Sequence, residues 1–137
     1  MSLPLPVAAL LLYSIAGAAL LVYVPFLVVA YGRLQAGYDQ RAPRAIFEKL
    51  PAYAQRATWA HQNSFESFML FAAAALMAYV TRQDSVWVAG AAIAYLVARL
   101  LFSLFYILDI PLARSLMFGV GTLCIATLMG TSLSSLH

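Results

Sequence analysis

The sequence has very little charge for its length. Only 9% of its 137 residues are Asp, Glu, Lys or Arg, whereas an average soluble domain has about 25%. Hydrophobic residues make up 64% of the chain, and polar surface could not cover a core of this composition in water. Cys124 is the only cysteine, which excludes an internal disulfide and a cysteine-based metal site. The composition therefore predicts a protein whose solvent is lipid.

Several classes of function lack their usual signals. The net charge is +3, but the basic residues occur in connecting segments and at the ends of apolar runs, so no nucleic-acid partner is expected. No Ser/His/Asp or Cys/His nucleophile set and no glycine-rich phosphate loop is visible. The two histidines, His61 and His137, have no neighbouring ligands in the sequence, so no metal site is predicted.

Four apolar runs are each long enough to cross a bilayer as a helix. About 20 apolar residues span the hydrocarbon core. The predicted spans cover residues 5–31, 61–80, 86–108 and 112–134. Only helices or closed barrels satisfy backbone groups in lipid, and uninterrupted apolar runs lack the alternation of a barrel. We therefore predict a single all-α domain, an integral membrane four-helix bundle of left-handed, up-down topology.

The connections predict an orientation. Residues 32–60 form a long polar loop that carries five Lys or Arg residues, and with Arg114 this face holds six. The opposite face holds only Arg82. Because Lys and Arg are enriched in cytoplasmic loops, we expect the long loop to be cytoplasmic and both termini to be periplasmic or lumenal.

Polar residues within the membrane are arranged in two stripes. Insertion of an ionisable residue costs roughly 2.5–3.5 kcal/mol, so each requires an explanation. The stripes have the same spacing: Arg56, Trp59, Asn63 and Glu66 in the second helix, and Arg99, Phe102, Tyr106 and Asp109 in the third. At about 100° per residue each set lies on one helix face, and both stripes lie toward the long loop.

Two interpretations of these stripes remain open. In the structural one, Glu66 and Arg99 form an ion pair inside the bundle, with Asn63 as an interhelical hydrogen-bonding group. In the functional one, a polar pocket opens to the cytoplasm, and its arginines bind an anionic ligand. Glu66 would then receive an ammonium group and Tyr106 would offer a hydroxyl, a set of groups suited to a small zwitterionic peptide with two carboxylates.

Two segments resemble the MAPEG family, the membrane-associated proteins in eicosanoid and glutathione metabolism. The first segment, RATWAHQNSFE, runs from Arg56 to Glu66. The second comprises Arg99, Tyr106, Pro111, Arg114 and Ser115. Together with the four spans and the long first loop, the resemblance covers essentially the whole chain.

This resemblance implies a homotrimer in the membrane, with glutathione bound between neighbouring subunits near the cytoplasmic face. It assigns glutathione binding to Arg56, Asn63, Glu66, Arg99 and Tyr106, and the catalytic role to Arg114 and Ser115. A fixed guanidinium would lower the pKa of the glutathione thiol from about 8.5, the value of free cysteine. The thiolate would then attack a hydrophobic electrophile that enters from the lipid.

The sequence also departs from the family pattern. Trp59 stands where the family usually has a second arginine, while Phe102 and Phe118 replace positions that are polar or tyrosine in other members. These changes argue against a specialised eicosanoid synthase. They leave two functions open: a glutathione transferase or peroxidase, and a non-catalytic protein that binds lipid or a partner complex. A small multidrug transporter is disfavoured, because residues 5–31 contain no carboxylate to couple protons.

Overall fold

The computed structural model describes residues 3–137, and all regular secondary structure in that range is helical. Four long helices follow one another: α1 (Val7–Ala36), α2 (Ala52–Val80), α3 (Val86–Ile107) and α4 (Pro111–Ser134). A 3-10 turn, η1 (Phe47–Lys49), interrupts the connection between α1 and α2. All four long helices are apolar enough to cross a membrane, which confirms the predicted all-α membrane bundle.

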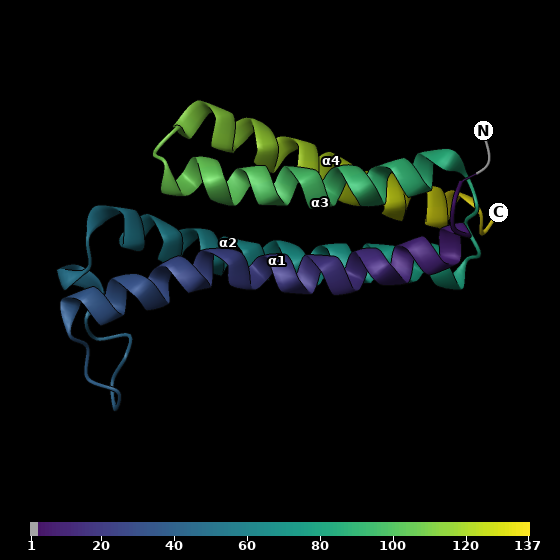
Figure 1. Cartoon of the computed structure of the whole chain (residues 1–137). Helices are drawn as coiled ribbons and strands as arrows, with labels where there is room; N and C mark the ends of the chain where they lie inside the picture. Colours follow the sequence, from purple (N-terminus) through teal and green to yellow (C-terminus); the bar gives the residue numbers. More distant parts are fainter. Residues whose placement is uncertain (1–2) are drawn as a thin grey trace.

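The helices run alternately up and down. Figure 1 shows both termini at one end of the bundle and the α1–α2 connection at the other, where α1 and α2 extend beyond the turn that joins α3 to α4. Helix α1 packs against α2 and α3, and α4 packs against the same two helices. The end that carries the α1–α2 connection is called the loop end below.

The first two helices are longer than the predicted spans. Helix α1 continues to Ala36 and α2 already begins at Ala52, so the predicted loop of residues 32–60 is in fact limited to residues 37–51. A helix can continue past the lipid boundary because its backbone bonds are internal. Gly37, with a φ of 70° in the left-handed region, ends α1, and Pro51 precedes the first residue of α2.

A proline lies within α1, close to a bond between α1 and α2. Pro25 has no N–H to donate to the preceding turn. On the facing helix, the His61 Nδ1 lies 2.8 Å from the Val22 carbonyl oxygen. Because a carbonyl can only accept, Nδ1 is the donor in this bond. The bond is made three residues before the proline and ties α1 to α2.

Small residues let α1 and α2 approach closely. A Cβ on Gly32 would lie 2.5 Å from the Ala54 Cβ, so only glycine fits at this crossing. Nearer the centre of the bundle, the rings of Phe71 and Tyr95 stack with centroids 3.8 Å apart, and the Tyr95 hydroxyl bonds to Ser67 at 2.8 Å. Close backbone contact and internally satisfied polar groups are how helices associate in lipid.

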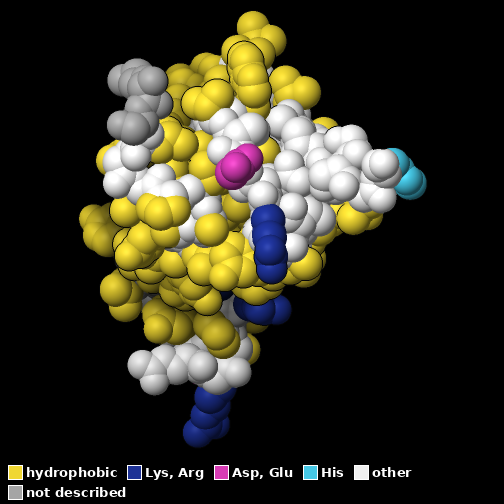
Figure 2. Space-filling model, turned by 90° about the vertical axis from the view of Figure 1, so that its right-hand side faces the viewer, with side chains coloured by type: hydrophobic (Ala, Val, Ile, Leu, Met, Phe, Trp, Pro, Cys, Tyr) yellow, Lys and Arg dark blue, Asp and Glu magenta, His cyan; other side chains and the backbone are white. Residues whose placement is uncertain are grey.

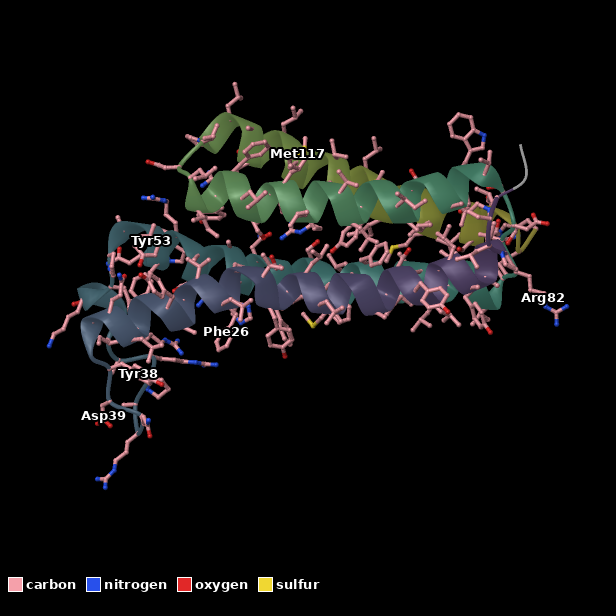
Figure 3. All side chains as sticks on the ribbon, in the orientation of Figure 1. Phe26, Tyr38, Asp39, Tyr53, Arg82 and Met117 are labelled. Atoms are coloured by element: carbon pink, nitrogen blue, oxygen red, sulfur yellow. The ribbon has the colours of Figure 1, made fainter. Side chains whose placement is uncertain are left out.

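The outer surface is strongly apolar. On α1, four side chains spaced seven residues apart are each about 70% exposed: Tyr13, Leu20, Leu27 and Leu34. Figure 2 looks onto the end of the molecule that carries the termini and shows few charged groups among hydrophobic ones. Arg82 lies at this end, opposite the loop residue Asp39 (Figure 3). Exposed apolar surface of this extent suits a lipid environment.

Candidate functional site

Arg99 is bonded inside the bundle to the second helix. Only 4% of its surface is exposed. Its Nη2 donates to the Asn63 Oδ1 at 3.0 Å and to the Ser64 Oγ at 3.2 Å. Its guanidinium carbon also lies 3.9 Å from the centre of the Phe102 ring. The second and third helices are therefore joined at Arg99 by hydrogen bonds to an amide and a hydroxyl, and not by an ion pair.

Glu66 is not the partner of Arg99. The Glu66 side chain is exposed on α2, whereas Arg99 is buried and bonds to Asn63 and Ser64. The ion pair of the structural interpretation is therefore wrong. The reason is geometric: Asn63 and Ser64 lie on the side of α2 that faces α3, and Glu66 lies on the outer side of the same helix.

Aromatic rings separate Arg99 from Arg114. The Phe102 ring packs edge-on against Tyr106 with centroids 5.6 Å apart and lies 6.3 Å from Phe118. The Arg114 guanidinium carbon lies 4.5 Å from the centre of the Tyr106 ring, a cation–π contact. Tyr106 and Arg114 are each partly exposed, so Arg114 is fixed over an aromatic face and still open to a ligand.

Arg56 binds the end of the third helix. Its Nε donates to the Ile107 carbonyl at 3.0 Å, and Ile107 is the last residue of α3. A cation is favoured there, because the last carbonyls of a helix lack internal partners and carry its negative dipole end. This bond connects α2 to the turn between α3 and α4. Arg114 and Ser115 lie just after that turn, at the beginning of α4.

The structure brings together most, but not all, of the candidate residues. Asn63 and Arg99 are directly bonded, Tyr106 and Arg114 are in contact, and Phe102 lies between the two pairs. Glu66 and Ser115 are exposed on the surface. Beside Arg99 lies a void of only about 10 Å³, and neither Glu66 nor Arg114 lines it.

A much larger cavity lies elsewhere, between α1, the loop and α2, and is called the α1–α2 cavity below. Its volume is about 620 Å³, which lies within the usual range for small-molecule sites. It is lined by Phe26, Val29, Arg33, Pro43, Arg44, Phe47, Leu50, Thr58, His61, Gln62 and Phe65. Figure 3 shows Phe26 on the same side of α1 as the loop residues Tyr38 and Asp39.

The α1–α2 cavity combines apolar walls with cationic groups. Arg33 and Arg44 contribute two guanidinium groups, and the Nε of Arg33 is buried without a hydrogen-bond partner among the described residues. His61 presents a ring whose Nδ1 is already bonded to Val22. This set can accept an anionic group against an apolar wall.

In the sequence these two arginines indicate only the topology of the chain in the membrane. Arg33 lies at the end of α1 and Arg44 lies in the loop, and neither belongs to a polar stripe. The signal that could have found them is the segment from Arg33 to Pro51, which contains three arginines and two prolines. A proline inside this segment interrupts a helix. The connection between α1 and α2 is therefore irregular and lies close to the start of α2.

The comparisons with known proteins agree with the architecture. No curated protein and no solved structure matches the chain. A sequence model of the MAPEG family matches residues 10–134, nearly the whole length. The match extends from the first helix to the last and includes both polar stripes. This four-helix membrane protein therefore belongs to the MAPEG family.

Proposed function

We propose that this protein is a membrane-embedded glutathione transferase or peroxidase, which conjugates or reduces hydrophobic electrophiles with the glutathione thiolate. One observation carries the proposal: the Arg114 guanidinium is fixed over the Tyr106 ring, 4.5 Å from its centre, and stays partly exposed. A fixed cation stabilises an adjacent thiolate more than the neutral thiol. Because the Arg114 guanidinium is already in place before the sulfur attacks, no reorganisation is needed during the reaction, and this lowers the barrier.

The chemistry needs no further cofactor. In conjugation, the thiolate sulfur forms a bond to an electrophilic carbon, and the leaving group departs with the bonding electrons or a double bond takes up a proton. In peroxide reduction, the sulfur attacks one peroxide oxygen and the O–O bond breaks. A second glutathione then gives the disulfide, while the peroxide leaves as alcohol and water. Arg114 would hold the sulfur, with Ser115 as a neighbouring hydroxyl donor.

We further propose that the site is completed in a homotrimer. The cationic face formed by α2, α3 and α4 has fixed charges and a void of only about 10 Å³ beside Arg99, while the α1–α2 cavity has room for a tripeptide. Repeating one head-to-tail contact three times closes a ring and brings these unlike faces together. The exposed carboxylate of Glu66 supports this packing, since an ionised group facing lipid is costly and contact with a neighbouring copy would shield it.

The membrane supplies the second substrate. The outer faces of the helices are apolar, so a hydrophobic electrophile would concentrate in the bilayer and reach the site laterally. Glutathione would enter from the aqueous side at the loop end. The basic residues at that end support a cytoplasmic location for it, since Lys and Arg are enriched in cytoplasmic loops, and both termini would then be periplasmic or lumenal.

Thiolate formation tests this proposal directly. Purified protein in detergent is mixed with glutathione, and the ultraviolet absorbance of the thiolate is followed at neutral pH. We expect a thiolate signal that saturates with glutathione and disappears when S-methylglutathione replaces it. Calorimetry with millimolar glutathione provides a second measurement, and the absence of both heat and thiolate signal would exclude the proposed activity.

A second candidate is a non-catalytic family member that binds lipid or a partner complex. Phe102 is only 3% exposed and covers Arg99, and Trp59, 43% exposed, occupies the position of an arginine. Both features make the face less polar. This candidate predicts copurified lipid in the α1–α2 cavity and no thiolate signal, so the same experiment distinguishes the two functions.

A further inference from the structure

Arg99 cannot itself touch a ligand at the surface of the bundle. Its side chain is 4% exposed, and the Phe102 ring lies over its guanidinium carbon at 3.9 Å. Its charge is nevertheless retained in an apolar bundle, where burial of an unpaired cation is costly. The nearest polar groups that it binds are neutral, namely Asn63 and Ser64.

The bond to Arg99 fixes which way the Asn63 amide is turned. A guanidinium has only donors, so Asn63 must present its Oδ1 toward Arg99, as the 3.0 Å bond shows. The amide nitrogen then points away from Arg99. Asn63 is partly exposed and lies on the stripe between two exposed residues, Trp59 and Glu66. Among the described residues no group accepts a hydrogen bond from this nitrogen, and it is not one of the buried polar atoms left without a partner, so its two N–H groups are open to a ligand.

The cation also strengthens these donors. A charged group bonded to the amide oxygen polarises the amide, and hydrogen bonds in a low-dielectric interior reinforce one another. The charge of Arg99 therefore acts on a ligand through the two polarised N–H groups of Asn63, whereas the guanidinium itself lies under the Phe102 ring. A carboxylate, which only accepts hydrogen bonds, matches such a pair of donors.

We propose that Arg99 is a positioning residue, which holds the Asn63 amide with its N–H groups outward to bind a carboxylate of the ligand. This inference rests on the proposed function, in which the ligand is glutathione with its two carboxylates. It changes the role that the resemblance assigns to Arg99, from contact with glutathione to orientation of the residue that makes the contact.

The substitution Asn63→Asp tests the orientation. The new carboxylate keeps an acceptor for Arg99 and keeps the shape of the side chain, but presents an acceptor where the N–H donors were. We expect the full-length protein in detergent to unfold at the same temperature or higher, while calorimetry shows glutathione binding at least about tenfold weaker, since a hydrogen bond to a charged group is lost. Unchanged glutathione binding by this variant would overturn the inference.

A double-mutant cycle separates positioning from direct contact. We expect Arg99→Leu to weaken glutathione binding about tenfold in the wild-type background and by less than about twofold in an Asn63→Ala background, because its effect acts through Asn63. Arg99→Lys, which keeps a charged donor, should restore part of the affinity. An equal loss in both backgrounds would show that Arg99 contacts the ligand and would overturn the inference.

The wild-type titration distinguishes the two proposals. If the wild-type protein binds no glutathione, the proposed function and the ligand of Asn63 fail together. If the wild-type protein binds glutathione while Asn63→Asp binds it equally well, only the positioning role of Arg99 fails.

Discussion

The arginines at the loop end occupy two different environments. On the face formed by α2, α3 and α4, each is fixed: Arg99 under the Phe102 ring, Arg114 over the Tyr106 ring and Arg56 on the last carbonyl of α3. In the α1–α2 cavity, Arg33 and Arg44 line a volume of about 620 Å³. One region thus has oriented charge, and the other has room beside its cations.

This difference separates two requirements of a binding site. Orientation favours the chemical step, because a group fixed before the reaction needs no reorganisation. A cavity with cationic groups binds the ligand equally well in its ground state and in the transition state, so it favours binding and not the chemical step. Under the proposed trimer, the first region of one copy meets the second region of its neighbour. Substitutions in the two regions should therefore affect different kinetic constants.

The largest expected effect is from the fixed region. The substitution Arg114→Leu removes the guanidinium that is stacked on Tyr106. We expect kcat/KM for conjugation at neutral pH to fall by at least about 100-fold, the usual loss when one preorganised charge-stabilising group is removed. The measurement is a steady-state assay with glutathione and an apolar electrophile dissolved in the detergent.

Arg114→Lys is the matched control for this substitution. It keeps the charge but loses the planar group that stacks on the ring, so we expect an intermediate activity. A rate for Arg114→Leu within threefold of the wild type would show that the fixed region does not perform the chemistry. The cavity region would then become the place to search for the reacting group.

The next effect concerns the crossing that supports the cavity region. A Cβ at Gly32 would lie 2.5 Å from the Ala54 Cβ, so Gly32→Ala must push α1 away from α2. We expect the free energy of unfolding in mixed micelles to fall by about 2 kcal/mol, as for overpacked cores. Gly90→Ala is the control, because no atom lies within 4 Å of its added Cβ. Equal stability of the two variants would contradict the close approach.

A smaller effect is expected in the cavity itself. Arg33→Ala removes one of its guanidinium groups, and we expect the KM for glutathione to rise about tenfold, since a charged hydrogen bond is lost. The value of kcat should change little, because this interaction is equal in ground and transition states. Arg41→Ala removes the same charge from an exposed loop residue outside the cavity. A similar rise in KM for Arg41→Ala would attribute the effect to net charge.

Most of the fold could be predicted from the sequence because lipid imposes a simple rule. Every span must be a helix of sufficient apolar length, and the predicted spans of residues 86–108 and 112–134 match α3 and α4 closely. The predicted second span begins at residue 61, whereas α2 already begins at Ala52, because the segment from Ala52 to Ala60 lacks the apolar signal of a span although it is helical. The number of apolar residues needed to cross a bilayer predicts only the part of a helix that lies in lipid, and not its polar extension.

The candidate site was harder to predict than the fold. Helical spacing put Asn63 and Glu66 on one stripe, and Arg99 on another, but spacing does not say which residue of a stripe faces the neighbouring helix. The structure resolves this: Asn63 faces Arg99, and Glu66 faces outward. The α1–α2 cavity was missed because it depends on how a loop folds back onto two helices, which periodicity does not encode.

Trp59→Arg is the smallest predicted change, and it acts on the boundary between the two regions. Trp59 is 43% exposed and its ring lies 5.6 Å from Phe47 and 6.5 Å from Tyr106. A guanidinium also stacks on aromatic rings, so the substitution should be tolerated and should add a cation beside Asn63. We expect calorimetry to show glutathione binding about threefold tighter, the gain of a partly exposed charge pair. Trp59→Leu, the uncharged control, should give no such gain. Weaker binding by Trp59→Arg alone would mean that the tryptophan face is matched to an apolar ligand, as the non-catalytic function requires.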